Sequence, residues 1–214
     1  MPDVKSSRRE KAAQTRARIV EAAHAEFLER GFHGATIASV ASRAGVATQT
    51  VYFVFHTKAE LISAVIDAMV MAPDPDTGEA LPPELTPWWL EMVADPDPVS
   101  SLQRFVRGAA PLYERAAAVS EVLRGAALTD DEVRRTHEHH MRLQREGFGG
   151  VVRLLAEKGT LRDGLDEARA TDVLLTVFGD STYHLLRTEH GWSHEAVVGW
   201  FENVLPDLLL GTTG

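Results

Sequence analysis

Residues 36–61 read TIASVASRAGVATQTVYFVFHTKAEL, and the rest of the chain is organised around this stretch. Four apolar residues recur at helical spacing and define one face of a short helix: Ile37, Val40, Ala41 and Ala44. Thr36 stands directly before them, where its hydroxyl can accept from a first-turn N–H and cap the helix. Gly45 ends the pattern because glycine adopts a positive φ without steric cost, and we expect Val46 behind it to be buried.

A second short helix is predicted at about residues 47–54. Val51 and Phe55 lie four residues apart and face inward together. This turns a small set of polar, aromatic and aliphatic side chains outward: Thr48, Gln49, Thr50, Phe53 and Val54. Two short helices joined by a tight glycine turn form a helix-turn-helix, whose second helix enters the major groove of DNA.

Three runs make this arrangement resemble the DNA-binding domain of the TetR family of transcriptional regulators: Gly45-Val46-Ala47, Val51-Tyr52-Phe53-Val54-Phe55 and Thr57-Lys58-Ala59-Glu60-Leu61. Upstream residues match the first helix of that family and the entry into its second: Ile19, Val20, Glu21, Ala22, Ala23, Phe27, Gly31, Phe32 and Thr36. The resemblance covers about residues 15–70 with specific residues, and the remainder only by length and helical character.

The resemblance implies which side chains would meet DNA. Thr48, Gln49 and Thr50 carry over as contacts to base edges or nearby phosphates; glutamine can bond adenine, and threonine can touch a thymine methyl group. The other positions that carry over are Thr36, Ala47, Tyr52, Phe53 and Lys58. Of these, Tyr52 and Lys58 match positions that hold the DNA backbone, and Thr36 can donate to a phosphate.

Two residues depart from the family pattern. Ala47 replaces a serine that often caps the recognition helix, which costs about 1 kcal/mol unless Thr48 takes that role. Val54 replaces a histidine or tyrosine that often bonds a phosphate, so we expect one backbone contact to be missing there.

The composition excludes several classes of protein. Cysteine is absent, so no disulfide framework, thiol nucleophile or cysteine-ligated metal site is available. No apolar run approaches the roughly 18 residues that a membrane span needs, and the basic N-terminus lacks the apolar region of a signal peptide. We therefore expect a cytoplasmic protein without membrane contact.

The formal net charge of −9 is unevenly divided along the chain. Residues 1–71 hold 9 Lys and Arg against 7 Asp and Glu, or +2, whereas residues 72–214 hold 13 against 24, or −11. The first 18 residues alone hold 6 basic against 2 acidic residues. A basic tail can be merely solvated, but beside a helix-turn-helix we expect residues 1–14 to be a flexible arm that contacts DNA phosphates or the minor groove.

The pattern predicts an all-α fold of about nine to ten helices in two domains. The DNA-binding domain comprises residues 15–71, ending in a linking helix that starts at a capping box from Thr57 to Glu60. Five of the ten prolines fall within residues 72–87, which marks the domain boundary. In residues 72–214, an effector-binding and dimerisation domain, helices are expected around Trp88, from about 98 to 128 with a break at Pro111, and at about 129–158, 166–189 and 193–210.

Three polar side chains interrupt the apolar stripe of the helix at 129–158: His137, His140 and Gln144. Each needs a partner, since an unsatisfied buried polar group costs about 1–3 kcal/mol. By resemblance, the middle helices surround an apolar effector pocket. Its candidate lining is Trp88, Met92, Phe105, Tyr113, His137, His140, Met141, Gln144 and Phe148. Both the aromatic and the polar members of this set could instead belong to an ordinary core.

The run His137-Glu138-His139-His140 also suggests a metal site. A metal needs three or four ligands, however, and only His184 offers itself nearby in the pattern. Enzyme motifs are absent: the chain has no glycine-rich phosphate loop, no GxSxG and no HExxH. We predict no metal, no cofactor and no catalytic residue.

The resemblance further implies a homodimer in which the last two helices form a four-helix bundle with their mates. Candidate interface residues are Phe178, Gly179, Ser181, Trp200, Phe201, Val204 and Leu208. The predicted function is a ligand-responsive regulator, most simply a repressor, that binds a palindromic operator in double-stranded DNA and is released by a small lipophilic effector. The alternative is a binding module that senses a small molecule without repressing.

Overall fold

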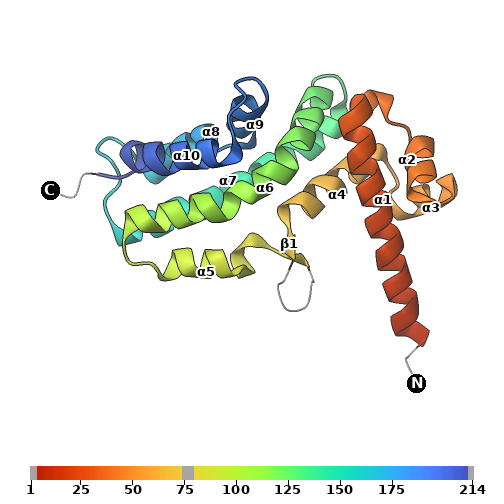
Figure 1. The fold of residues 1–214 in the computed structure, drawn as a ribbon, viewed down its shortest axis with the longest axis horizontal. Coiled ribbons are helices and arrows are strands. Elements are labelled where there is room, and N and C mark those ends of the chain that lie inside the picture. The colour runs from red at the N-terminus through yellow and green to blue at the C-terminus, as the bar shows by residue number, and fades with distance from the viewer. Residues whose placement is uncertain (1–3, 74–79, 212–214) are drawn as a thin grey trace. The chain divides into compact units, whose positions relative to one another are not determined.

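The computed structural model describes residues 4–73 and 80–211, and side chains at 10–71 and 81–211. The all-α fold class is confirmed (Figure 1). The helices are α1 (Val4–Gly34), α2 (Ile37–Ala44), α3 (Thr48–Val54), α4 (Lys58–Val70), α5 (Pro87–Ala94), α6 (Pro98–Ala127), α7 (Asp131–Lys158), α8 (Glu167–Val177), α9 (Asp180–Thr188) and α10 (His194–Leu209). A 3-10 turn, η1 (Pro83–Leu85), and a two-residue antiparallel pairing of β1 (Ala72–Pro73) with β2 (Ala80–Leu81) complete the described elements.

The chain forms two compact units. Unit 1 comprises residues 1–68 and 121–137, and unit 2 comprises residues 69–120 and 138–214. The end of α6 and the start of α7 thus join the N-terminal unit, although we expected all residues after 71 in the second domain. Residues 74–79, inside the predicted boundary segment, lie outside the described residues.

The N-terminal arm requires a correction. We expected residues 1–14 to be flexible, but α1 begins at Val4 and runs through them. Residues 4–14 contain neither glycine nor proline and hold two lysines, two arginines, two alanines, a glutamate and a glutamine, all good helix formers. Residues 1–3 lie outside the described part of the chain. At the other end of α1, Gly31 has a positive φ, 67°, and kinks the helix, which continues to Gly34.

Helices α6 and α7 also differ from expectation. α6 continues through Pro111, where we predicted a break. Proline lacks one backbone donor but can sit inside a helix whose packing holds it, and the neighbouring residues Ala109, Ala110 and Tyr113 are buried. α7, expected from about residue 129, begins at Asp131, and the Asp130 carboxylate caps it by accepting from the N–H groups of Glu132 and Val133.

The segment predicted as one helix at 166–189 is two helices, α8 and α9, separated at Phe178 and Gly179. A Cβ at Gly179 would collide with the backbone oxygen of Leu175. Two side chains satisfy carbonyls next to the break: the Tyr113 hydroxyl donates to Phe178 O at 2.8 Å, and the Thr182 hydroxyl donates to Thr176 O at 2.7 Å. These bonds stabilise a geometry that helical periodicity alone cannot predict.

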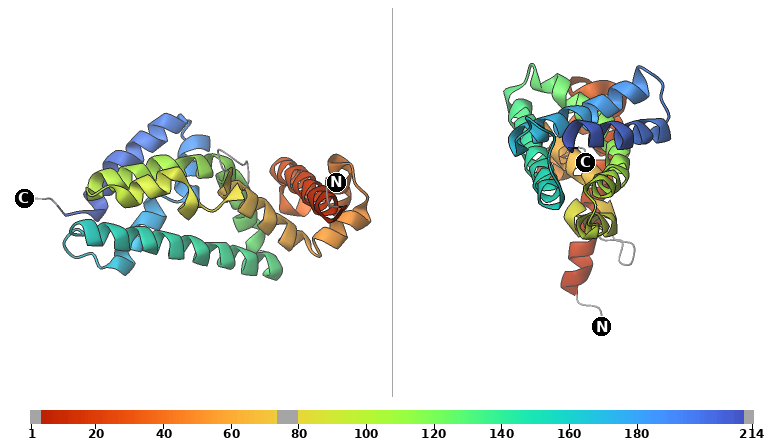
Figure 2. Two further views of the ribbon diagram at one scale, coloured as in Figure 1. Left: turned by 90° about the horizontal axis from the view of Figure 1, so that it is seen from below. Right: turned by 90° about the vertical axis from the view of Figure 1, so that its left-hand side faces the viewer.

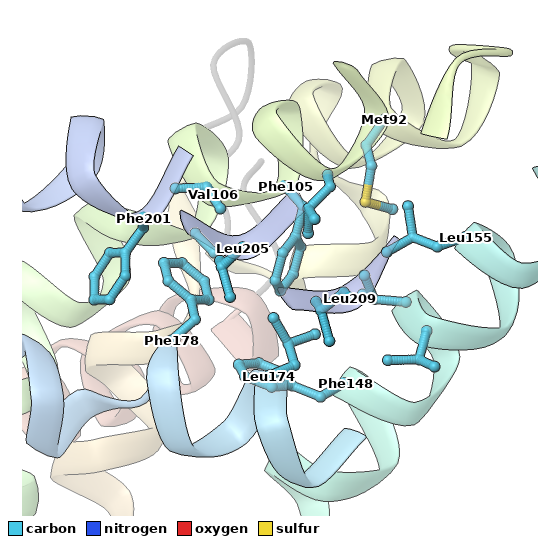
Figure 3. Close-up of a cluster of buried hydrophobic side chains, with 14 of the residues drawn as sticks. Met92, Phe105, Val106, Phe148, Leu155, Leu174, Phe178, Phe201, Leu205 and Leu209 are labelled. Atoms are coloured by element: carbon cyan, nitrogen blue, oxygen red, sulfur yellow. The ribbon is translucent and has the colours of Figure 1, made fainter. Parts of the chain in front are cut away.

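The core of unit 2 is centred on this break. Phe178 is fully buried, and its ring lies edge-on to Phe105, Tyr113 and Phe201 at centroid distances of 5.4, 4.9 and 5.0 Å. Figure 3 shows Phe105, Phe178 and Phe201 in this cluster. Leu174, Leu205 and Leu209 join them from α8 and α10 (Figure 3). α10 packs against both α8 and α9 (Figure 2). None of the helices in the described ranges is long and apolar enough to cross a membrane.

Candidate nucleic-acid interface

The helix-turn-helix lies in unit 1, between α1 and α4. Thr36 caps α2 as predicted: its hydroxyl accepts from Ser39 N at 3.0 Å, and the Ser39 hydroxyl accepts from Thr36 N at 3.2 Å. Gly45 ends α2 with φ 65° and ψ 39°, the left-handed conformation that glycine adopts without strain. The N–H of Val46 returns to Ala41 O at 3.0 Å. Val46 itself is half-buried rather than fully buried.

The recognition helix is α3 (Thr48–Val54). Val51 is fully buried and Phe55 is 3% exposed, so these two residues fix α3 against unit 1 as predicted. Ala47 occupies the N-cap position of α3, but its methyl side chain makes no capping hydrogen bond. The side chain of Thr48 does not supply the missing bond. In the first turn of α3, the N–H of Thr50 donates to Ala47 O at 2.9 Å, and the N-cap side chain satisfies none of the other N–H groups.

The outer face of α3 carries hydrogen-bonding and apolar groups together. Thr48 and Gln49 are exposed and Thr50 is half-buried. Phe53 is 83% exposed and Tyr52 is 48% exposed. An amide and hydroxyls beside a bare aromatic ring suit a base-pair edge, where hydrogen-bond acceptors, donors and thymine methyl groups alternate.

Lys58 has a role that the sequence did not predict. Its ammonium donates to Phe32 O at 2.6 Å and Ala35 O at 3.0 Å, and it lies 4.3 Å from the centroid of the Phe32 ring. Burial lowers the pKa of Lys58, and Asp130 opposes this. Lys58 therefore ties α4 to the segment that leads into the Thr36 cap. Two of its three N–H groups are occupied inside the protein, which leaves one for the phosphate contact that the resemblance implies.

An ion-pair network joins α1 to α2. Arg43 donates from Nε to Glu26 at 2.9 Å and from Nη1 to Glu29 at 2.8 Å. The Glu26 side chain is 3% exposed. The Ser39 hydroxyl, with Arg30 and Arg43, keeps the pKa of Glu26 below its usual value although burial acts against them. Sequence reasoning missed this network, for which charge spacing between two helices gives no local signal.

The candidate effector residues differ in their burial. Met92, Phe105, Tyr113 and Phe148 are buried and belong to the packed core cluster, which is the alternative that the sequence left open. Met141 is 40% exposed, so it does not line an enclosed space. His137, His140 and Gln144 are half-buried. Burial is the main cause that raises the pKa of Tyr113, Asp180 adds to it, and a hydrogen bond with Gln144 opposes it.

The candidate dimer residues also divide. Phe178 and Phe201 are fully buried inside the single chain, so they are core residues and not free for a partner. Gly179 is buried and is needed for the break between α8 and α9 rather than for close approach of a second copy. The other four candidates are half-buried, so part of each side chain can still contact a partner: Ser181, Trp200, Val204 and Leu208. Groups of three or more His, Cys, Asp or Glu residues able to hold a metal do not occur in the described part of the chain.

Comparisons with known proteins agree with this geometry. Residues 19–65 match the family of bacterial regulatory proteins called the tetR family. The HTH-type transcriptional regulator TtgR of Pseudomonas putida is 43% identical over 61 residues, which is 28% of this chain and 29% of TtgR. The HTH-type transcriptional regulator YdeS of Bacillus subtilis is 29% identical over 179 residues, covering 81% of this chain and 79% of YdeS. Residues 19–65 of this chain are therefore similar to the DNA-binding part of the tetR family.

Solved structures share the fold of this chain beyond its DNA-binding domain as well. NalD, the secondary repressor of the MexAB-OprM multidrug efflux pump in Pseudomonas aeruginosa, is 21% identical with a TM-score of 0.69, covering 94% of this chain and 98% of NalD. FadR of Bacillus subtilis, solved in complex with stearoyl-CoA, is 15% identical with a TM-score of 0.64, covering 90% and 96%. The TetR family comprises regulatory proteins rather than enzymes, as predicted.

Proposed function

We propose that this protein is a TetR-family transcriptional repressor that binds a palindromic operator as a homodimer and is released by a small lipophilic effector. The observation that carries the proposal is the outer face of α3, where exposed Thr48 and Gln49 stand on a helix that buried Val51 and Phe55 hold rigidly. A helix fixed in this way presents both side chains from a defined backbone position, from which they can discriminate among base edges.

Two features support the dimer. A DNA-binding domain of this size covers one half-site of an operator. Two-fold symmetric dimers place their recognition helices about 34 Å apart, which is one turn of DNA. On α9 and in the segment between α9 and α10, apolar side chains remain partly open to solvent in the single chain, with Leu185 40% and Trp192 36% exposed. The rings of Trp192 and Trp200 lie 6.2 Å apart on this face, which a second copy would cover.

The effector part of the proposal concerns the aromatic cluster of unit 2. Trp88 is half-buried, and its indole ring is seated directly on Gly108, where any Cβ would collide with it. Its ring centroid lies 6.3 Å from that of Phe105, which contacts Phe148 and Phe178. A lipophilic ligand entering this cluster would have to displace side chains, and Trp88 is placed to move first. Such a ligand releases DNA only if it binds the released form more tightly.

The test of the proposal is binding of the purified full-length protein to a duplex taken from upstream of its own gene. Fluorescence anisotropy is measured between 50 and 200 mM salt, with a duplex of the same length and shuffled sequence as control. We expect tighter binding to the upstream duplex and an affinity for both that falls steeply with salt. Equal affinity for the two duplexes would contradict operator reading. Absence of binding to either would favour the sensing module without repressor activity.

A further inference from the structure

The C-terminal end of the recognition helix is poor in groups that can hold DNA. Among residues 52–55, only Tyr52 has a polar side-chain atom. Val54 replaces a residue that often bonds a phosphate, and two of the N–H groups of Lys58 are bonded to Phe32 O and Ala35 O. A helix-turn-helix domain needs contacts to the DNA backbone on both sides of the bases it contacts, because these phosphate contacts set the register of the protein on the duplex.

Arg16 lies at this end of α3. Its guanidinium carbon is 4.7 Å from the centroid of the Phe55 ring, and Phe55 is the C-cap residue of α3. A cation within about 6 Å of an aromatic face is held by the charge distribution of the ring. A contact with a ring face occupies no oxygen acceptor, so the N–H groups of the guanidinium are left for another acceptor.

The surroundings leave Arg16 available. It is exposed, and no ion pair of Arg16 occurs within residues 10–71 and 81–211, whose side chains are described. In the same unit Arg43 bonds Glu26 and Glu29, and Arg30 pairs with Glu26. An arginine that is positioned by a ring but not neutralised by a carboxylate is suited to an anionic ligand.

We propose that Arg16 is a DNA-backbone contact, whose guanidinium donates to a phosphate beside the C-terminal end of α3. The inference rests on the proposed function, and it adds a contact from α1 that the family resemblance did not supply. The ligand is a phosphodiester rather than a base, because helix-turn-helix proteins read base edges with the N-terminal residues of the recognition helix, here Thr48 and Gln49. α1 continues as a helix on the N-terminal side of Arg16, so the residue sits on a rigid support rather than in a flexible arm.

The test compares Arg16→Gln with Arg18→Gln in the full-length protein. The two substitutions remove the same charge from neighbouring exposed positions of α1, but only Arg16 stacks on Phe55. The probes are the upstream duplex and a random-sequence duplex of about 30 base pairs, a length that spans two half-sites one turn apart with flanking DNA. Affinity is measured by anisotropy between 50 and 200 mM salt, and thermal unfolding checks that both variants are folded.

We expect Arg16→Gln to lower the affinity for both duplexes alike, by about tenfold or more. The slope of log affinity against log salt concentration should become shallower by about 0.9 for each subunit. Arg18→Gln should change either affinity by less than about threefold, as expected for a charge near DNA without a fixed contact. Arg16→Lys keeps the charge but loses the planar stacked geometry, so its affinity should lie between those of the wild type and Arg16→Gln. This variant also tests the contact if Arg16→Gln proves unstable.

Three results would overturn the inference. Equal effects of Arg16→Gln and Arg18→Gln would mean that the charge acts only at long range. A loss confined to the upstream duplex would mean that Arg16 reads sequence instead of holding the backbone. Wild-type protein that binds neither probe would refute the proposed function itself, whereas wild-type binding with an unaffected Arg16→Gln variant would refute only the contact.

Discussion

Lys58 illustrates how a side chain can match a family pattern and still do structural work. Lys58→Met keeps the apolar stem over Phe32 but removes the donors to Phe32 O and Ala35 O. We expect a loss of about 1–3 kcal/mol in the free energy of unfolding, because two carbonyls lose their partner. Urea unfolding measures it, with Lys11→Met as an exposed control expected within about 0.5 kcal/mol of wild type. An unchanged free energy of unfolding in Lys58→Met would show that the hydrogen bonds to Phe32 O and Ala35 O make no net contribution to stability.

Local chemistry made some residues predictable and others not. The Thr36 cap and the positive φ of Gly45 follow from the residue type and its place in the helical pattern, and both are present. The bonds of Lys58 and the stacking of Arg16 on Phe55 join segments far apart in the sequence. Such contacts depend on how helices pack, which the order of residues along one helix does not record.

Among the helices, the break between α8 and α9 gives the sharpest test. Gly179→Ala would drive a Cβ into Leu175 O, so the break must shift and with it the central position of Phe178. We expect destabilisation by more than about 2 kcal/mol, the range for strain and repacking in a core. The control is Gly147→Ala on α7, where an added Cβ meets nothing within 4 Å. It should raise stability by about 0.5–1 kcal/mol. Equal stability of the two variants in urea would contradict the strained break.

The end of α5 predicts a pH effect. Arg104 is the main cause that lowers the pKa of Asp95 to about 2, and Ser100 adds to it. Because the pKa in the folded protein lies below the unfolded value of about 3.9, the stabilisation is complete above about pH 5 and is lost as the pH falls towards 2. Asp95→Asn should therefore be less stable than wild type at pH 7, and the difference should disappear near pH 2. A difference that is the same at pH 7 and pH 3 would contradict this linkage.

Helix boundaries were predictable where the chain carries its own stop signal. The Ser193 cap places the start of α10, and Gly45 places the end of α2. Pro111 was misjudged because α6 continues through it between buried neighbours, and Gly179 was misjudged because the stabilising hydroxyl of Tyr113 comes from another helix. The spacing of apolar residues predicts which face of a helix is buried. It does not predict whether a side chain from another helix will bond the backbone carbonyls next to a break.

The half-buried apolar side chains of α10 predict a dimer. Val204→Asp places a charge among half-buried Trp200 and Leu208, so we expect monomers at micromolar concentration. Light scattering after gel filtration measures the mass, and circular dichroism checks the fold. Asn203→Asp, an exposed polar position on the same helix, should remain dimeric. A wild-type protein that is monomeric at this concentration would refute the dimer.

The division of the chain was predictable only in part. The excess of basic residues before position 72 and the prolines after it mark two regions along the sequence. The assignment of residues 121–137 to the N-terminal unit is a tertiary property. Likewise the effector candidates Phe105 and Phe148 have the same apolar character whether they line a cavity or fill it, and in the structure they are packed together.

The central claim is that α3 reads DNA sequence through Gln49. The most direct test measures wild-type and Gln49→Ala protein on the bound upstream duplex and on a series of duplexes, each with one base pair replaced. Gln49→Ala should lose about 1–3 kcal/mol of binding free energy and should become indifferent to one position in each half-site, while preference at the other positions is kept. An equal loss on every duplex, with the wild-type pattern of preference intact, would contradict the claim.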